Sequence, residues 1–398
     1  MPGDQGAAGP PAQPQLPSGA ADMADRLPAP GPRLLINAQA FGFGPAAAAA
    51  VLAEELALLG CVIDYVGEGH TLDLQRTPPY RAIHDWTDLP EDQRLAQLRR
   101  RAPHYDLFVT AMDFPAAALA RRAGLDVAVY DALTWFWPEI PAVARDTVVY
   151  LAQDFFGVRE RIAADPALRS RALVVPPLIP PRRAWRPGRH VLVNLGGLHN
   201  PYWRTSDAVA YARLMLEAVR AAQPVARPVV ATASRRVAAE LADPAVGTYG
   251  HADVLDLMGG AAYACMTPGL GHIYDAAATG VPTLWLPSVN ETHPAQARRL
   301  AAHGYCDAHL DWADLGQAID DAAPTPDFLA AVGAAVRRTS DTPALRDLLT
   351  ARIAKSTAGL GPAPSRARAL TDRFGHGGTQ RAAAALVRRA TGQGETDD

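Results

Sequence analysis

The residues with the clearest chemical meaning lie between Thr267 and Leu300, in the segment TPGLGHIYDAAATGVPTLWLPSVNETHPAQARRL. The apolar run before this segment has the length of a buried strand, and Gly269 and Gly271 then allow the backbone to turn sharply and to approach a ligand closely. A helix that begins at about Gly271 would point its free N–H groups and the positive end of its dipole at a ligand above that strand. The segment therefore predicts a seat for a diphosphate.

Two polar side chains on this predicted helix could face the same ligand. Asp275 follows His272 by about one helical turn, so both side chains can point to one side of the helix. A carboxylate at Asp275 could accept hydrogen bonds from the hydroxyl groups of a ribose. The Gly-Val-Pro sequence at 280–282 would end the helix, and TLWLP would form the next strand.

Composition limits the possible functions. The chain has 398 residues and is 49% hydrophobic, which is enough for two domains of ordinary size with a core each. Its net charge of -3 offers no basic surface for nucleic acid. Cys61, Cys265 and Cys306 lie far apart in the sequence, so we expect them in the core of a protein from a reducing compartment. Because no apolar run approaches the roughly 18 residues of a membrane span and no signal pattern is seen, we expect a soluble cytoplasmic protein.

Two series of strands and helices are expected to position these groups. The Pro- and Gly-rich residues 1–32 cannot bury enough apolar surface to order themselves, so we expect disorder there. Apolar runs of strand length then occur at 33–39, 61–67, 105–111, 125–132 and 146–153, and again at 190–197, 228–234, 246–250, 261–267 and 282–287. Helical patterns separate several of them. This alternation predicts an α/β fold with two doubly wound parallel-sheet domains.

The boundary between the two domains is predicted from proline content. The segment LVVPPLIPPRRAWRPG, residues 173–188, is too rich in proline for regular structure and is the expected linker. It divides the chain into a first domain at 33–180 and a second domain at 181–398. The helical C-terminal part, from about 326 to 391, ends in RAAAALVRRA, a helix that could cross back to the first domain.

In the segment at 267–300 the chain resembles the nucleotide-sugar glycosyltransferases of the GT-B fold, most closely the MurG-like group. That family pattern is matched here by Gly269, Asp275, Gly280, Val281, Pro282, Pro287 and Gln296. Asp275 stands where glutamate is usual, so its ribose contact could be weaker or bridged by water. The resemblance implies two Rossmann-like domains facing across a cleft, with a UDP-sugar in the second domain, an acceptor in the first, and no metal or other cofactor.

Loops that follow the strands of the second domain should hold the donor, because the carboxyl ends of parallel strands open into the ligand crevice. In this family the third such loop, Tyr249 to His251 here, commonly holds the nucleobase. The predicted donor-binding residues are Asn194, Gly196, Gly197, Thr232, Ser234, Tyr249, His251, Thr267, Gly269, Gly271, His272, Asp275, Asn290 and Gln296.

The acceptor is expected beside the loop FGFGP, which follows the first strand directly. This loop lacks the third glycine of a dinucleotide-binding fingerprint, and the rings of Phe41 and Phe43 could instead form a stacking platform for a flat molecule. Other candidates follow later strands of the same domain. The predicted acceptor-binding residues are Phe41, Gly42, Phe43, Gly44, Asp131, Trp135 and Glu139.

The first-domain motifs AFGFGP, GHTLDLQR and DALTWFWPEIP are similar to those of actinobacterial proteins grouped with cytosylglucuronate synthase of nucleoside antibiotic biosynthesis. This resemblance implies transfer from UDP-glucuronate to N1 of cytosine, with inversion at the anomeric carbon. The ring nitrogen must lose a proton, for which Asp113 and His70 are the candidate bases. The carboxylate of the sugar would bind an arginine fork, from Arg76 or Arg204.

Other functions stay open at this point. The protein could be a glycosyltransferase for another small natural-product acceptor, a UDP-sugar 2-epimerase with the same fold and donor site, or a non-catalytic helper of that fold. Sequence patterns of metalloenzymes and of serine hydrolases, such as HExxH, paired CxxC and GxSxG, are not found. The expected partners are a UDP-sugar and a small acceptor, without nucleic acid or membrane, and the sequence does not define the oligomeric state.

Overall fold

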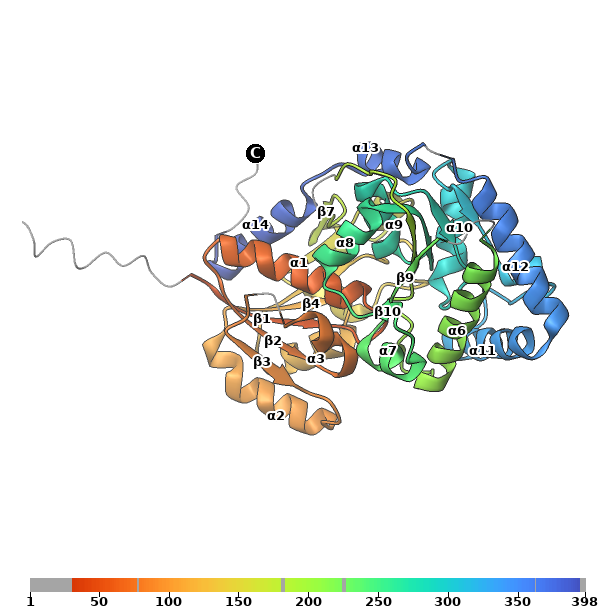
Figure 1. The fold of residues 1–398 in the computed structure, drawn as a ribbon. Coiled ribbons are helices and arrows are strands. Elements are labelled where there is room, and N and C mark those ends of the chain that lie inside the picture. Colours follow the sequence, from red (N-terminus) through yellow and green to blue (C-terminus); the bar gives the residue numbers. More distant parts are fainter. Residues whose placement is uncertain (1–30, 77–78, 180–182, 224–226, 362, 394–398) are drawn as a thin grey trace, which may run out of the picture.

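The computed structural model describes residues 31–393 except 77–78, 180–182, 224–226 and 362 (Figure 1). The N-terminal tail that we predicted to be disordered lies outside the described residues apart from positions 31 and 32, and so does the segment 394–398. The described chain forms two α/β units that follow one another in the sequence, each with its own parallel sheet.

The first unit contains a seven-stranded sheet in the order β3-β2-β1-β4-β5-β6-β7, and every pairing is parallel. Its strands are β1 (Arg33–Ala38), β2 (Val62–Gly67), β3 (Ala82–Asp85), β4 (Leu107–Ala111), β5 (Val127–Asp131), β6 (Val149–Gln153) and β7 (Ala172–Val175). The residues of β4, β5 and β6 are all buried, as expected of parallel strands that are covered on both faces. Their carboxyl ends lie at one edge of the sheet.

The second unit contains a six-stranded parallel sheet in the order β10-β9-β8-β11-β12-β13. Its strands are β8 (His190–Asn194), β9 (Val229–Thr232), β10 (Val246–Gly247), β11 (Ala261–Met266), β12 (Thr283–Trp285) and β13 (Ala308–His309). Because β11 lies between β8 and β12, the loops that follow these three strands are neighbours at the carboxyl edge of the sheet. The diphosphate seat predicted after β11 therefore lies at the centre of that edge.

Helices connect the strands and cover both sheets (Figure 1). They are α1 (Gly44–Leu58), α2 (Glu91–Arg101), α3 (Phe114–Arg122), α4 (Val158–Ala163), α5 (Pro166–Arg169), α6 (Thr205–Ala221), α7 (Arg235–Leu241), α8 (His251–Gly259), α9 (Leu270–Thr279), α10 (Thr292–Ala302), α11 (Thr325–Asp341), α12 (Pro343–Ala358), α13 (Leu370–Phe374) and α14 (Gly378–Ala390). Gly280 ends α9 with a φ of 76°, a conformation that favours glycine. No helix in the described part of the chain is both long and apolar enough to cross a membrane.

The proline-rich segment differs in part from the prediction. Residues 173–175 belong to strand β7, which pairs with β6, so they are regular structure and not linker. We assigned these residues to the linker because of the prolines that follow them, and the prediction therefore missed a short edge strand of four residues. The C-terminal helix α14 packs on α1 and against β6 and β7 of the first sheet. Its first residue, Gly378, lies so close to Pro176 that an added Cβ would be 1.9 Å from the Pro176 carbonyl oxygen.

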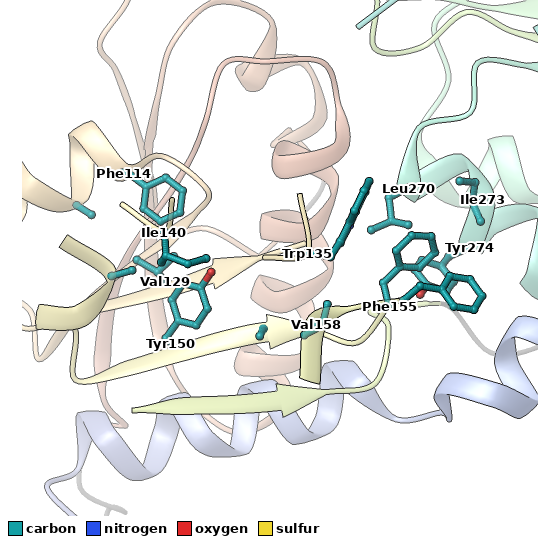
Figure 2. Packing of buried hydrophobic residues seen from close by; sticks show 14 of the residues in the cluster. Phe114, Val129, Trp135, Ile140, Tyr150, Phe155, Val158, Leu270, Ile273 and Tyr274 are labelled. Carbon is teal, nitrogen blue, oxygen red and sulfur yellow. The ribbon is translucent and has the colours of Figure 1, made fainter. Parts of the chain in front are cut away.

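The two units share a hydrophobic cluster. Figure 2 shows Trp135 and Phe155 of the first unit beside Leu270 and Tyr274 of α9. The ring of Phe155 lies 6.4 Å from that of Tyr274, whose hydroxyl donates a 2.8 Å hydrogen bond to the backbone oxygen of Asp154. This packing places the carboxyl edges of the two sheets opposite one another.

Candidate active site

A cavity of about 410 Å³ lies between the two units and is lined by loops from both carboxyl edges. The second unit contributes the segments that the sequence assigned to the donor. All of the predicted donor-binding residues line it except Ser234, whose hydroxyl caps α7 by accepting from the backbone N–H of Val237. The position of Ser234 at the end of a strand suggested a ligand contact, but the same position also begins a helix.

The start of α9 forms the centre of the second-domain side of the cavity. Gly269 is the N-cap residue, and Leu270 and Gly271 form the first turn of the helix. A Cβ added to Gly269 would lie 3.4 Å from Nε2 of His293, so that imidazole faces the beginning of the helix. Across the loop after β8, a Cβ on Gly196 would lie 3.7 Å from Nε2 of His272. Two glycine turns, two imidazoles and a helix N-terminus thus converge on one space.

Asp275, expected to bind a ribose, forms an ion pair that the sequence did not reveal. Its Oδ1 lies 2.9 Å from Nε2 of His251, the first residue of α8. The carboxylate raises the pKa of His251 above its ordinary value, because it stabilises the imidazolium. Among the described residues, Oδ2 of Asp275 accepts no hydrogen bond, and both side chains line the cavity. The pair therefore leaves one carboxylate oxygen for a ligand.

The other two histidines of the cavity can be assigned tautomers from their partners. Nδ1 of His272 lies 3.0 Å from the backbone oxygen of Thr267, which can only accept, so Nδ1 is the donor and Nε2 keeps a lone pair. The backbone N–H of Val289 lies 3.4 Å from Nδ1 of His293, which makes Nε2 of that ring the N–H donor. Burial lowers the pKa of both histidines, that of His293 to about 3. Both rings are therefore neutral at neutral pH.

The loop FGFGP lies against the second domain and lines the cavity with all four predicted residues, Phe41 to Gly44. Gly42 has a φ of 62°, and its backbone N–H donates a 2.7 Å hydrogen bond to the backbone oxygen of His199. A Cβ added to Gly42 would lie 3.3 Å from the Gly197 oxygen, which explains why glycine stands in this loop. The ring of Phe43 is exposed to the cavity beside Gly196.

The remaining acceptor-binding predictions do not place side chains in the cavity. Asp131 is fully buried, and its carboxylate accepts hydrogen bonds from Trp137 Nε1 at 2.8 Å, from the Leu133 backbone and from the Tyr150 hydroxyl. Trp135 packs in the shared hydrophobic cluster (Figure 2). Glu139 is exposed and lines a separate surface hollow.

Asp131 ends strand β5, and Trp135 and Glu139 follow it, as predicted. The side chains of Asp131 and Trp135 are buried in the core, however, and that of Glu139 is exposed to solvent. Trp137, held by Asp131, lines the cavity in place of Trp135. The two tryptophans are two residues apart in the sequence TWFWPE, and only their packing decides which one faces the cavity.

Neither candidate base lines the cavity. Asp113 caps α3 by accepting from the Ala116 backbone N–H at 3.0 Å. His70 donates from Nε2 to the Gly42 oxygen at 2.7 Å, and its ring stacks on that of His199 with ring centres 5.0 Å apart. These contacts stabilise the FGFGP loop on the side away from the cavity. Both side chains therefore make structural hydrogen bonds to the backbone, and neither faces the cavity.

The two arginines predicted for a sugar carboxylate lie elsewhere as well. Arg76 is exposed, and the side chain of Arg204 is 84% exposed with Asp207 as its neighbour. Neither lines the cavity. An arginine residue alone is a weak signal for such a site, because arginine is abundant in this chain and mostly lies at its surface.

Sequence reasoning missed several residues of the lining. The first domain contributes the amides of Gln39 and Gln153 together with apolar side chains, and its described lining residues include no Asp, Glu, His, Lys or Arg. Oε1 of Gln153 accepts from the Tyr130 hydroxyl at 2.6 Å and from the Leu178 backbone at 3.0 Å, so its amide N–H₂ group stays available. Gln153 is the last residue of β6, so the strand-end rule could have found it.

Two other lining residues, Glu291 and His293, begin the helix α10 after β12. Both lie within the segment that suggested the donor site, but from the part of that segment after β12 only Asn290 and Gln296 were selected. No group of three or more His, Cys, Asp or Glu side chains that could hold a metal ion occurs among the residues that the structure describes.

Comparisons with known proteins support the architecture. No protein-family model and no curated protein matches the chain. The solved structure of TcCGT1 in complex with UDP covers 92% of this chain and 100% of its own, with 10% identity and a TM-score of 0.52. Os79 from O. sativa in complex with UDP covers 89% and 100%, with 11% identity and a TM-score of 0.51. The chain is thus similar in fold to these proteins, and its two Rossmann-like parallel-sheet domains facing across a cleft form a GT-B fold.

Proposed function

We propose that the protein is a glycosyltransferase that takes a sugar from a UDP-sugar and transfers it to a small acceptor. The observation that carries this proposal is the division of the cavity into two chemically different halves. The second-domain half has a helix start, histidines, carboxyls and amides, whereas the first-domain half is apolar and aromatic with two amides. A cleft with one polar and one apolar half suits two substrates that meet at the domain boundary.

The order of the second-domain loops along the cavity indicates how the donor would be oriented in it. The nucleoside would lie near Tyr249 and Asp275, where Oδ2 can accept from a ribose hydroxyl. The diphosphate would then lie at the start of α9, where the free N–H groups of the first turn and Nε2 of His293 can donate to it. The UDP in the structures of TcCGT1 and Os79 supports this choice of nucleotide.

The transfer requires charge stabilisation and a proton acceptor. As the bond between the anomeric carbon and the β-phosphate oxygen breaks, negative charge grows on UDP beside the helix start, which is already oriented to stabilise it. The attacking atom of the acceptor forms the new bond from the opposite face, which gives inversion. Its proton would pass to Nε2 of His272, whose lone pair faces the domain boundary beside Gly196. His272 therefore replaces Asp113 and His70 as the candidate base.

The acceptor half suits a flat, uncharged molecule. The rings of Phe43 and Trp137 offer stacking surfaces, and the amides of Gln39 and Gln153 offer donors and acceptors to a polar edge. Cytosine, which the sequence resemblance predicts, has such a polar edge and stays our first acceptor to test. The predicted donor UDP-glucuronate has less support, because neither Arg76 nor Arg204 lines the cavity.

Binding and turnover of UDP-sugars test the proposal. UDP binding would be measured by calorimetry, and UDP-sugars would then be incubated with and without cytosine while UDP and products are followed by mass spectrometry. Acceptor-dependent release of UDP with a glycosylated product supports the transferase. Conversion of the UDP-sugar without any acceptor would indicate an epimerase, and binding without turnover across an acceptor panel would indicate a helper.

A matched pair of variants locates the nucleotide. Gly271→Glu places a carboxylate in the first turn of α9, where an added Cβ meets no other atom within 4 Å. It should abolish UDP binding by repelling the diphosphate while leaving the fold intact. Gly259→Glu, at the far end of α8 and equally free of neighbours, is the control. Unchanged UDP affinity in Gly271→Glu would contradict the proposed placement.

A further inference from the structure

The first-domain half of the cavity contains a side chain whose hydrogen-bonding polarity is fixed by the fold. Gln153 is the last residue of β6, at the carboxyl edge of the sheet, and it lines the cavity. In the register of β5 and β6, Tyr130 pairs with Leu151, two residues before Gln153. Because side chains two residues apart on a strand point to the same face, Gln153 and Tyr130 lie on one face of the sheet. The amide of Gln153 and the hydroxyl of Tyr130 therefore meet at the edge of the cavity.

Two protein donors determine which end of this amide is left for a ligand. Oε1 of Gln153 accepts a 2.6 Å hydrogen bond from the Tyr130 hydroxyl and a 3.0 Å hydrogen bond from the backbone N–H of Leu178. A backbone N–H can only donate, so it would repel the N–H₂ group if the amide were turned over. Burial raises the pKa of Tyr130, so the phenol keeps its proton and stays a donor. The amide oxygen is therefore committed to the protein, and the ligand meets the N–H₂ group.

The N–H₂ group of Gln153 is unpartnered but accessible. Within the described chain, Nε2 donates to no acceptor. The unpartnered side-chain nitrogens and oxygens that are fully enclosed in this part of the chain do not include Nε2, so the atom keeps accessible surface although the residue is only 4% exposed. A nearly buried donor without an acceptor costs free energy, and a ligand that supplies an acceptor atom recovers it.

The surroundings of Nε2 make this donor selective. The described first-domain lining has no charged side chain, and its surface is mainly apolar and aromatic, with Leu133, Trp137 and Leu178 among its members. A ligand that fills such a space displaces the water that could otherwise hydrogen-bond to the amide. A ligand that then places a donor or an apolar edge against Nε2 leaves the N–H₂ group without an acceptor, which weakens binding.

We propose that Gln153 is a specificity-determining residue, which selects acceptor molecules that present a carbonyl oxygen or an unprotonated ring nitrogen to its N–H₂ group. This inference rests on the proposed function and names the chemical class of the acceptor. A flat molecule with such an atom satisfies the unpartnered donor. A molecule of the same shape that carries its own N–H₂ group at that position brings two donors together and binds more weakly.

The test uses two small flat probes, 2-pyridone and aniline, on the full-length protein saturated with UDP. 2-Pyridone presents a carbonyl oxygen where aniline presents an N–H₂ group. Titrations followed by ligand-observed NMR give both dissociation constants, and their ratio is the measured quantity. Gln153→Glu is the informative variant, because it keeps one oxygen for Tyr130 and Leu178 and replaces the N–H₂ group with a second oxygen that can only accept.

The ratio should shift toward aniline by at least about tenfold in Gln153→Glu, since one mismatched hydrogen bond is enough for such a change. Gln93→Glu, the same change of charge on the exposed surface of α2, is the control and should keep the wild-type ratio. An unchanged ratio in Gln153→Glu, or no binding of 2-pyridone to the UDP-bound wild type, would overturn the inference and leave the proposed function standing. Failure of the wild type to bind UDP would refute the proposed function, and the inference with it.

Discussion

Replacing Asp275 with asparagine should destabilise the protein in a way that depends on pH. The variant keeps the shape of the side chain but removes the charge that pairs with His251 at 2.9 Å. A hydrogen bond to a charged group contributes roughly 1.5–3 kcal/mol to stability. Because the imidazole is 30% exposed and partly screened by water, we expect the lower end of that range, a loss of about 1.5 kcal/mol at pH 6.

The direction of the pH dependence follows from the pKa of His251, which the carboxylate of Asp275 raises above its ordinary value. The stabilisation is complete below the pKa of the unfolded-state histidine, about 6.5. It is lost as the pH rises through the raised pKa of the folded state, because the imidazole then becomes neutral. The difference in free energy of unfolding between wild type and Asp275→Asn should therefore shrink to below about 0.5 kcal/mol at pH 9.

Urea unfolding followed by circular dichroism at pH 6 and pH 9 measures this difference. Asp243→Asn is the matched control, because Asp243 pairs with Arg220 through contacts of 2.6 and 2.9 Å in the same domain. Arginine does not titrate in this range, so the loss caused by Asp243→Asn should be the same at both pH values. An equally constant loss in Asp275→Asn would refute the assignment of a charged His251–Asp275 pair.

Three further predictions concern the base, the acceptor and the C-terminal helix. His272→Gln should lower kcat at least about a hundredfold while changing UDP affinity little; a parallel loss of UDP affinity would make it a phosphate ligand instead. Trp137→Leu should raise the KM for the acceptor without changing UDP affinity, because its ring lines the first-domain half of the cavity, where we propose that the acceptor binds. Gly378→Ala should lower the free energy of unfolding by about 1–3 kcal/mol, because its Cβ would lie 1.9 Å from the Pro176 oxygen. Gly259→Ala, whose Cβ would meet no other atom within 4 Å, should change the free energy of unfolding little. Equal unfolding free energies of the two variants would contradict the clash at Gly378.

Much of the fold could be predicted from the sequence, because long buried strands are continuous apolar runs. The strands of both sheet centres were found in this way, and the alternation with helices predicted two parallel sheets. Three short strands at or near the edges were missed, namely β3, β7 and β13. Strand β3 alternates between half-buried and exposed residues, and β13 has only two residues, so neither has the apolar run that marks a central strand.

The second-domain half of the cavity was predictable for a local reason. Gly269, His272 and Asp275 lie on one strand–turn–helix unit, and helix geometry alone places them near one another. The first-domain half depended on packing instead. Strand ends indicated Asp113 and Asp131, but one side chain caps a helix and the other is enclosed by Tyr150 and Trp137.

By itself, the sequence determined the two parallel sheets, the polar residues at the carboxyl ends of their strands and the start of α9. These features follow from periodicity and from the geometry of residues that are neighbours in the sequence. Only the tertiary structure decided which polar side chains remain free for a ligand. Partners such as His251 and Asp275, 24 residues apart, meet through the packing of α8 on α9, and no local pattern records that contact. A buried polar group forms its hydrogen bonds with the groups that the fold brings near it. Whether those groups belong to the protein or to a ligand separates a structural residue from a functional one.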